Sequence, residues 1–522
     1  MRAQSLQYLA TATLALLSAS SAAANDERAV FAHYMVGVIH EDHVHQDVDD
    51  AVAMGLDGFA LNIGDPSTQF TRDVFNNMFD YTRDNHPDFK LFISMDLWSQ
   101  NDTLNFDGYF VDFLGHDAYY KGPNGYPFVS TYGNGNFSKE KWQTWRNRFS
   151  DKLYFVPDFA GMIGEGNQTA AWWDEWDGVI DGLFDWESAW PERGLSNTQS
   201  IAADVVQVDS TASQNKTYMI GMSMLQYKNS YGANIYRAGE ENLSWRIHNI
   251  LNMSATSPSS PTFAQLLTWN DGPESHYLGT IWPEMNNDTD PSRYATQSAA
   301  PHTAIQPLLS SFIAAFKSTL GPADMQPQGP AKDKPAIGAL WYKSILASTA
   351  CPDEHSGELH DAKPDGYAVA ADVAAWAVVV ADDADDAAEL TLRGFSGGQQ
   401  VGDVVDLVPG FNFGNFSALR AGKQCMEVRD KAGALVAVAR GGGDVSGDCP
   451  DGIYNLNPQV VGLLDEELEE GGCVEDDGGD DDDDDGKDDD DSWGVRGVAL
   501  DRVGLVAGVL VSVLWVSGLV GL

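Results

Sequence analysis

The feature that most constrains the fold is a series of eight apolar, β-branched runs in the first 320 residues, separated by stretches with helical periodicity. Strands that are apolar along their whole length are typical of a parallel sheet buried on both faces. Eight such units in roughly 300 residues predict an α/β fold, the (β/α)8 barrel. A doubly wound sheet is the alternative. The expected strands cover residues 30–38, 55–63, 89–97, 127–131, 152–156, 179–186, 218–224 and 263–269.

The predicted strand ends carry acids and tryptophans, and functional groups of such barrels lie at the carboxyl ends of the strands. Five carboxylates are therefore expected to converge on one mouth, where one acid can protonate a leaving oxygen and another can activate water or attack. Indole faces beside them can stack on sugar rings. This pattern favours a glycoside hydrolase, although each acid alone could serve as a helix cap or ion-pair partner. The candidate residues are Asp96, Asp185, Glu187, Asp271 and Glu274, with Asn62, Trp98, Trp186, Trp190, Trp269, Asn270, His276 and Tyr277.

Two histidine features receive different interpretations. His33, within the first predicted strand, is expected either to orient substrate or water or to be a hydrogen-bonded core residue. The segment HEDHVH at 40–45 suggests a metal site, but the zincin pattern needs histidine where Val44 stands. The sequence contains neither a P-loop nor a nucleophile elbow, and we predict no metal and no cofactor.

The chain is strongly acidic, with 77 Asp and Glu against 31 Lys and Arg and a formal charge of −46. Such a charge repels phosphate backbones and argues against nucleic acid as a partner. Part of the excess lies in residues 465–491, which hold 18 acids and one lysine. Like charges at this density predict a solvated, extended spacer.

Both ends of the chain indicate secretion. Residues 1–24 combine Arg2, an apolar stretch and small residues, which predicts a signal peptide. The apolar segment 503–522 has no charge and no basic residue after it. With a short spacer and small residues before it (Gly486 or Ser492 as attachment site), it predicts a GPI signal, and a tail-anchored span is the alternative.

Potential covalent modifications agree with a secreted glycoprotein. Four cysteines in the last third are expected to form two disulfides in one of three connectivities: Cys351, Cys425, Cys449 and Cys473. Eight N-x-S/T sequons begin at Asn101, Asn136, Asn167, Asn215, Asn242, Asn252, Asn287 and Asn415.

Three motifs resemble glycoside hydrolase family 71, the fungal endo-α-1,3-glucanases or mutanases. They are VFAHYMVG at 30–37, GLDGFALNIG at 55–64 and WNDGPESHY at 269–277, and the resemblance spans about residues 29–345, with WYK at 341–343. It implies a (β/α)8 barrel, a β-sandwich-like accessory region and an inverting mechanism. Carried over by motif, Asp271 and Glu274 are the implied catalytic pair, with Asp96 as a third important acid.

We expect Glu274 to be the general acid and Asp271 the general base. An inverting pair needs its carboxyl groups roughly 6.5–9.5 Å apart, which two residues three positions apart can span in an extended loop. Gly272-Pro273 stands where the family more often has an aromatic residue and glycine, and proline stiffens the loop before Glu274.

The predicted organisation is a signal peptide (1–24), a catalytic barrel (28–325), a β-rich accessory domain (326–460), an acidic disordered stalk (461–494) and a GPI-signal tail (495–522). The predicted function is endo-hydrolysis of fungal-wall α-1,3-glucan by a monomer at the cell surface, attached to the membrane or wall only through a lipid anchor. Two alternatives remain: a catalytically silent wall-binding protein and a transglycosylase that remodels the wall.

Overall fold

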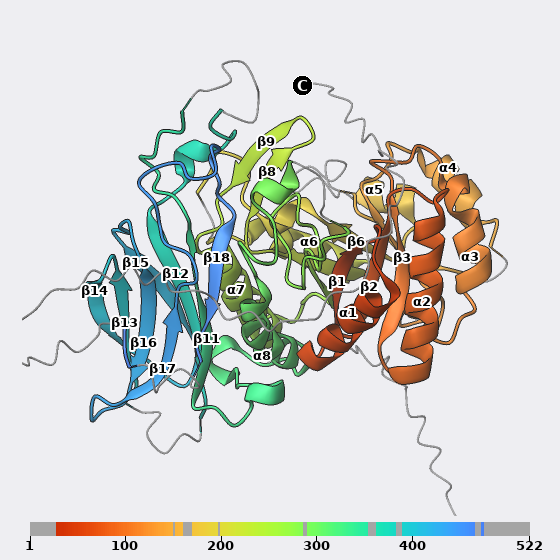
Figure 1. Cartoon of the computed structure of the whole chain (residues 1–522). Coiled ribbons are helices and arrows are strands. Elements are labelled where there is room, and N and C mark those ends of the chain that lie inside the picture. The colour runs from red at the N-terminus through yellow and green to blue at the C-terminus, as the bar shows by residue number, and fades with distance from the viewer. Residues whose placement is uncertain are drawn as a thin grey trace, which may run out of the picture.

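The structure is a computed structural model that describes residues 28–149, 152–159, 170–196, 199–285, 290–352, 362–382, 389–464 and 471–473. Within these ranges the chain forms a parallel barrel followed by two antiparallel sheets (Figure 1). The predicted signal peptide and GPI tail lie outside the described residues, as does most of the predicted stalk.

Eight parallel strands form the barrel, in the order β5-β4-β3-β2-β1-β10-β7-β6. A parallel bridge between Asp158 and Phe184 joins the two ends of this order, so the sheet closes on itself. This closure confirms the predicted (β/α)8 fold and excludes the doubly wound alternative. The strands are β1 (Ala29–Met35), β2 (Gly58–Ile63), β3 (Lys90–Asp96), β4 (Phe128–Tyr132), β5 (Tyr154–Val156), β6 (Gly182–Asp185), β7 (Thr217–Met222) and β10 (Phe263–Leu266).

Residues on alternate strand positions face the barrel axis. Near the amino ends of the strands, the Phe31 ring lies 4.9 Å from Phe92, 6.1 Å from Phe128 and 5.9 Å from Phe263. Aromatic packing therefore fills the lower barrel. Further along the strands, the inward positions carry polar residues at the carboxyl ends. The face of the barrel formed by these carboxyl ends is the mouth.

The helices cover the outside of the barrel, and local sequence explains their limits. In α2, Val74, Phe75, Met78 and Phe79 recur at helical spacing and are buried, and the side chain of Thr68 accepts the N–H of Thr71 to cap the helix. The helices are α1 (Glu41–Met54), α2 (Gln69–Asn85), α3 (Asp107–Phe113), α4 (Lys139–Arg146), α5 (Ala170–Trp176), α6 (Ala202–Ser213), α7 (Asn242–Thr256) and α8 (Gln306–Lys317).

Two four-stranded antiparallel sheets follow the barrel, in the orders β15-β12-β11-β18 and β14-β13-β16-β17. Their facing sides share one apolar core, which includes Leu340, Val378, Leu392 and Met426. The strands are β11 (Ala336–Lys343), β12 (Val373–Val380), β13 (Thr391–Ser396), β14 (Gln399–Asp406), β15 (Gly410–Ser417), β16 (Gln424–Arg429), β17 (Leu435–Arg440) and β18 (Pro458–Gly462). This arrangement confirms the expected β-sandwich-like region.

β11 connects the two parts because both of its faces are buried. Ile337, Ala339 and Trp341 belong to the barrel core, whereas Leu340 and Tyr342 face the second sheet. The Trp341 indole N–H donates to the backbone oxygen of Glu240 at 2.8 Å. The Lys343 ammonium lies 2.5 Å from the Glu240 carboxylate. The barrel and the sandwich therefore pack as one body through this sheet.

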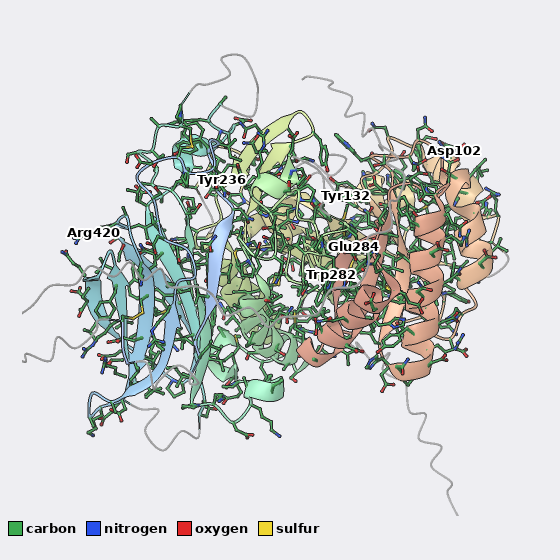
Figure 2. The ribbon with its side chains drawn as sticks, in the orientation of Figure 1. Asp102, Tyr132, Tyr236, Trp282, Glu284 and Arg420 are labelled. Atoms are coloured by element: carbon green, nitrogen blue, oxygen red, sulfur yellow. A yellow bond between two sulfur atoms is a disulfide. The ribbon has the colours of Figure 1, made fainter. Side chains whose placement is uncertain are left out.

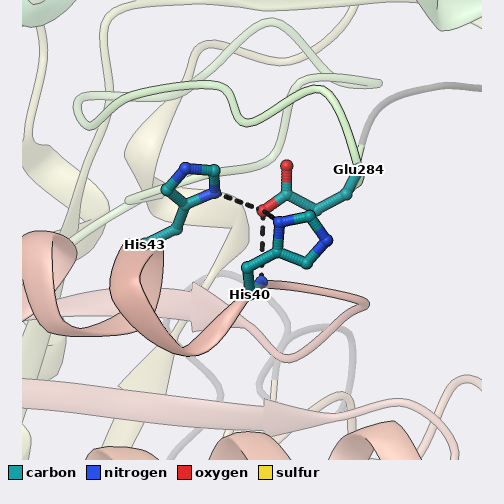
Figure 3. A group of neighbouring side chains, drawn as sticks. All are labelled: His40, His43 and Glu284. Atoms are coloured by element: carbon teal, nitrogen blue, oxygen red, sulfur yellow. Dashed lines mark hydrogen bonds and ion pairs between the residues drawn. The ribbon is translucent and has the colours of Figure 1, made fainter. Parts of the chain in front are cut away.

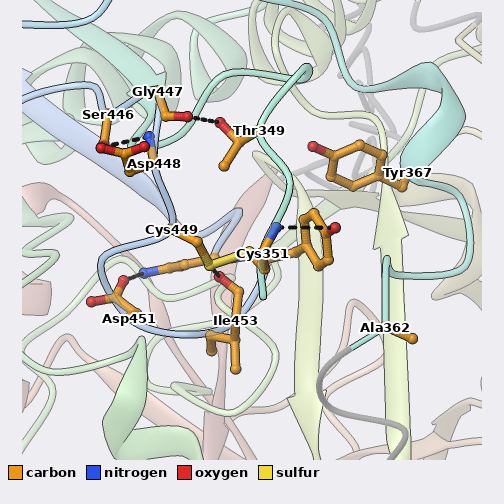
Figure 4. Close-up of a disulfide and its surroundings, with 12 residues drawn as sticks. Thr349, Cys351, Ala362, Tyr367, Ser446, Gly447, Asp448, Cys449, Asp451 and Ile453 are labelled. Carbon is orange, nitrogen blue, oxygen red and sulfur yellow. Dashed lines mark hydrogen bonds between the residues drawn. A yellow bond between two sulfur atoms is a disulfide. The ribbon is translucent and has the colours of Figure 1, made fainter. Parts of the chain in front are cut away.

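The four cysteines form the pairs Cys351–Cys449 and Cys425–Cys473. Figure 4 shows the first pair, where the Cys351 N–H donates to the Tyr454 hydroxyl at 3.2 Å. Ordered structure continues past the predicted boundary at residue 460, since β18 ends at Gly462 and Cys473 is tied to the second sheet. Two disulfides fit an oxidising compartment.

The sequons differ in their surroundings. Five begin at exposed asparagines, but Asn242 is buried and its amide donates to the backbone oxygens of Ala189 and Ser223 at 2.8 and 2.9 Å. A glycan at Asn242 is incompatible with these contacts, so this sequon is not a modification site of the folded protein. Over the ranges described above, every helix is too short or too polar to cross a membrane.

Candidate active site

Asp271 and Glu274 lie on one tight turn in the loop that follows β10. The N–H of Glu274 donates to the Asp271 carboxylate at 3.0 Å, and the N–H of Ser275 donates to the Gly272 oxygen at 2.9 Å. The sequence predicted an extended loop here. The turn forms instead because an Asp side chain can accept the N–H three residues on, around a Gly-Pro centre.

Three side chains hold the Glu274 carboxylate. The Lys228 ammonium lies 3.1 Å from Oε1, while the Gln226 amide and the His276 Nε2 lie 2.6 and 3.1 Å from Oε2. Burial alone would raise the pKa of Glu274, but Lys228 and His276 outweigh it and hold this pKa well below its usual range. Glu274 is therefore ionised across the neutral and mildly acidic range.

The pKa of Asp271 is shifted in the opposite direction to that of Glu274. Burial, followed by the negative charge of Glu274, raises the pKa of Asp271. Paired titratable groups whose surroundings separate their pKa values mark an acid and its ionised partner. Asp271 is therefore the better placed of the two to hold a proton, because the cations Lys228 and His276 contact Glu274 directly. The assignment of Glu274 as general acid and Asp271 as general base stays a prediction.

The two carboxylates are also closer than an inverting pair requires. One oxygen of each and one nitrogen of His276 all lie within 4.8 Å of one another, below the roughly 6.5–9.5 Å of inverting enzymes. The tight turn accounts for this proximity.

Asp96, the last residue of β3, is the third predicted acid. Its Oδ1 accepts the N–H groups of Trp98 and Ser99 at 3.0 and 2.8 Å, and its Oδ2 accepts the Ser99 hydroxyl at 3.1 Å. These contacts favour the charged form, yet burial prevails and raises the pKa of Asp96 to about 6. A carboxylate with this pKa is suited to act as a base near neutral pH.

The hydroxyl of Tyr132, which is labelled in Figure 2, lies close enough to four carboxylates to feel their charge. Burial raises the pKa of its hydroxyl, and the charges of Glu274, Asp96, Glu187 and Asp271 raise it further. The sequence analysis missed Tyr132 because the fourth strand was predicted to end at residue 131. A strand longer by one residue would have placed a polar aromatic at the strand end.

Other residues of the candidate site belong to no recognisable sequence motif. Lys228 and Gln226 lie on β8 (Gln226–Ser230), which pairs with β9 (Ala233–Arg237) in a hairpin after β7. Asp158, just after β5, accepts the N–H groups of Gly133 and Trp186 at 3.0 and 3.3 Å. An isolated lysine in a short hairpin, or an aspartate in a loop, gives no periodic signal, so only the fold brings these residues to the mouth.

The predicted aromatic walls divide into exposed and buried groups. Trp98 is 80% exposed at the rim. Trp186 is buried, 4.8 Å from the His33 ring and 4.6 Å from the Tyr132 ring. Trp190 is also buried, 5.3 Å from the His276 ring. Trp98 is therefore the indole that can stack on a sugar without rearrangement.

At the rim, Glu187 and Arg237 form an ion pair of 2.5 Å. Deeper in the barrel, Nδ1 of His33 pairs with the Gln265 amide at 2.9 Å, and burial lowers the pKa of His33 to about 3. Asn62 is buried near the mouth, and no described residue hydrogen-bonds to its side-chain amide. A buried, unpaired amide at a strand end is a candidate to bind substrate hydroxyls.

Four predicted site residues have side chains that pack against other parts of the protein and do not face the barrel axis. Strand alternation places Asp185 on the helix side of β6, where burial and then the charges of Asp158 and Asp204 raise its pKa to about 7. Trp269 is fully buried, with its ring 5.2 Å from Phe59. The remaining two are Asn270, which bonds the backbone of Met35, and Tyr277, which stacks on His302 at 3.9 Å.

His40, His43 and Glu284 form a group of potential metal ligands (Figure 3). The sequence analysis rejected the histidine motif on local spacing. The fold adds Glu284, which is more than 240 residues away along the chain.

The closed barrel and the acids gathered at its mouth define the protein as a (β/α)8 glycoside hydrolase. The chain belongs to glycosyl hydrolase family 71, whose family model matches residues 26–471. This match confirms the family that the three sequence motifs indicated.

Two relatives are consistent with membership of this family. A glucan endo-1,3-alpha-glucosidase of Schizosaccharomyces pombe is 28% identical over 323 residues, covering 58% of this chain and 69% of the relative. A mutanase of Penicillium rubens is 26% identical over 316 residues, covering 59% and 65%. The chain thus spans about two thirds of their length. Among solved structures, an endo-alpha-mannosidase of family GH99 from Bacteroides thetaiotaomicron has a TM-score of 0.40 at 10% identity, covering 56% of this chain and 98% of that one.

Proposed function

We propose that this protein hydrolyses α-1,3-glucosidic bonds within fungal-wall α-1,3-glucan. The observation that carries the proposal is the pair of opposite pKa shifts on one turn, with Asp271 raised and Glu274 lowered. Glycosidic cleavage needs such a proton donor beside a fixed negative charge. The names of the two relatives supply the substrate class.

In the proposed reaction, Asp271 protonates the leaving glycosidic oxygen. Glu274 stays ionised, keeps the pKa of Asp271 raised and stabilises positive charge that develops on the sugar ring. Asp96 then accepts a proton from the attacking water, since its pKa of about 6 makes it a better base than Glu274. An acid in the loop after β10 and a base at the end of β3 leave room for water, as inversion requires.

The substrate proposal is tested by incubating the secreted protein with insoluble α-1,3-glucan and following reducing ends and chain length. We expect internal cleavage with inverted anomeric configuration. An absence of new reducing ends would favour the silent wall-binding protein, and elongated transfer products would favour the transglycosylase. Retained configuration would contradict the role of Asp96 as a base.

The roles are tested with Asp271→Asn, Glu274→Gln and Asp96→Asn. Each should lower kcat on glucan by about 10²-fold or more, the lower end of general acid–base effects. On an α-1,3-gluco-oligosaccharide with an anomeric fluoride, whose departure needs no proton, Asp271→Asn should recover most of its activity. Recovery by Glu274→Gln instead would restore the roles predicted from the sequence.

We further propose that the protein is secreted and GPI-anchored, on the basis of its terminal sequence segments and its two disulfides. Phosphatidylinositol-specific phospholipase C should release active protein from cells, whereas a chain ending at Gly486 should enter the medium with unchanged turnover. Retention in membranes after phospholipase treatment, with peptides from Val503 onward still attached, would show a tail-anchored span.

A further inference from the structure

The three residues of the His–Glu cluster, His40, His43 and Glu284, converge where two loops of the mouth meet. His40 immediately precedes α1, His43 lies in its first turn, and Glu284 lies in the long loop after β10. The Glu284 carboxylate lies 2.5 Å from Nδ1 of His43 and 3.6 Å from Nδ1 of His40. Figure 3 shows both histidines beside this carboxylate. One potential ligand atom of each residue lies within 4.8 Å of the others.

Neighbouring residues fix this arrangement. The His43 ring stacks on Trp282 with centroids 3.7 Å apart and planes 5° apart. The Trp282 indole N–H donates to Asp47, one helical turn beyond His43, at 3.1 Å. The backbone N–H of His40 donates to Glu284 at 3.1 Å. Two of the three ligands are therefore held in place before any ion binds, which lowers the entropic cost of binding.

We propose that the His–Glu cluster binds Zn²⁺. Two imidazole nitrogens and one carboxylate are a ligand set that zinc takes, with water in the fourth position. Zinc–ligand bonds of 2.0–2.2 Å place tetrahedral ligands about 3.3 Å apart. The His40–Glu284 distance of 3.6 Å is near this value. The His43–Glu284 contact of 2.5 Å must open as the ion replaces the shared proton.

Zinc at this position joins the two loops and takes no part in bond cleavage. Met285, next to Glu284, packs against Gly37 of the first loop and receives a 3.3 Å contact from the Asn270 amide. Asn270 adjoins Asp271. The bound ion therefore braces the loop beside the proposed catalytic turn, residues 271–274. We expect zinc to raise the melting temperature.

The test uses the full chain without a histidine tag, after treatment with EDTA, and titrates ZnCl₂ at pH 7 by calorimetry. His40→Ala, His43→Ala and Glu284→Gln should each weaken the tight site by more than about 100-fold, beyond the upper end of what losing an outer-shell partner costs. His45→Ala is the matched control, since His45 belongs to the same HEDHVH segment but stacks on Tyr81 at 3.9 Å. It should bind zinc like the wild type.

A second readout is thermal stability. Saturating zinc should raise the melting temperature of the wild type and of His45→Ala, but not that of His40→Ala or His43→Ala. Zinc affinity that is equal in the cluster variants and the wild type would overturn the proposal and assign the ion to the acidic run of the sequence. Absence of binding would overturn it as well.

Discussion

At the residue scale, tryptophans in similar sequence positions have different roles. Trp98 and Trp269 both follow an apolar strand at its carboxyl end, yet Trp98 is 80% exposed and Trp269 is fully buried. The Trp269 ring leaves no space beside Gly279, where a Cβ atom would lie 2.4 Å from the indole. Trp98 is free to contact sugar, whereas Trp269 packs the loop that carries the catalytic turn.

Replacing Trp98 by alanine should raise KM for α-1,3-glucan by about 2- to 10-fold, because an aromatic stacking contact is worth about 0.5–1.5 kcal/mol. The melting temperature and kcat should change little. Trp269→Ala should instead cost about 3–5 kcal/mol of stability. Steady-state kinetics and thermal unfolding on the same preparations separate these effects. An unchanged KM in Trp98→Ala would remove Trp98 from the binding surface.

At the scale of elements, the β8–β9 hairpin supplies part of the candidate active site that the repeating barrel units do not. The N–H of Tyr227 donates to the backbone oxygen of Glu274 at 3.1 Å, which fixes the hairpin to the catalytic turn. The Tyr294 hydroxyl donates to the Pro273 oxygen at 2.7 Å and accepts the Asn229 N–H at 3.2 Å. Lys228 is thereby held against Glu274.

Lys228→Met should raise the pKa of Glu274, because it removes the cation that most lowers this pKa. The acidic limb of the kcat/KM profile, where Glu274 becomes protonated, should shift to higher pH, and activity at pH 5 should fall more than at pH 7. Lys332→Met, at an exposed position far along the chain, is the control. An acidic limb that stays in place would contradict the assignment of Lys228.

At the scale of the whole molecule, the barrel and sandwich meet at buried polar groups. The two ring nitrogens of His302 lie 3.1 Å from the backbone oxygens of Tyr277 and Pro458. Asn457, beside Pro458, donates its amide to the Tyr294 oxygen at 2.7 Å. The loop of the catalytic turn therefore also contacts the sandwich.

His302 should make stability depend on pH. Burial lowers its pKa to about 4, below the ordinary 6.5. Between these values the unfolded chain binds a proton that the folded chain excludes, so this contribution to stability is lost as pH falls from 6.5 to 4. His302→Gln should flatten the decline by up to about 3 kcal/mol. Unfolding in denaturant from pH 4 to 7 measures it.

His45→Gln, at a surface ring stacked on Tyr81, is the control for the His302 substitution. Its pH dependence should match that of the wild type. Asp47, whose pKa burial raises to about 7, contributes with the opposite sign, so the difference between variant and wild type is the informative quantity. A wild-type slope in His302→Gln would show that His302 is not the group that titrates.

The sequence by itself determined the eight barrel strands, because each is an uninterrupted apolar run and burial on both faces of a parallel sheet requires such runs. It also marked Asp96, Asp271 and Glu274, since strand ends and motifs are local features. By contrast, the GFNFGNFS sequence of β15 carries no such run and is rich in residues with low strand propensity.

Only the tertiary structure decided which side chains meet. Trp186 directly follows Asp185, the last residue of β6. The Trp186 ring lies beside His33, whereas the Asp185 side chain lies on the helix side. Lys228 reaches Glu274 across 46 residues, and Glu284 reaches His43 across 241. Such contacts depend on loop paths between elements, which hydrophobic periodicity does not encode. The opposite pKa shifts of Asp271 and Glu274 follow from these long-range contacts, which the sequence alone does not show.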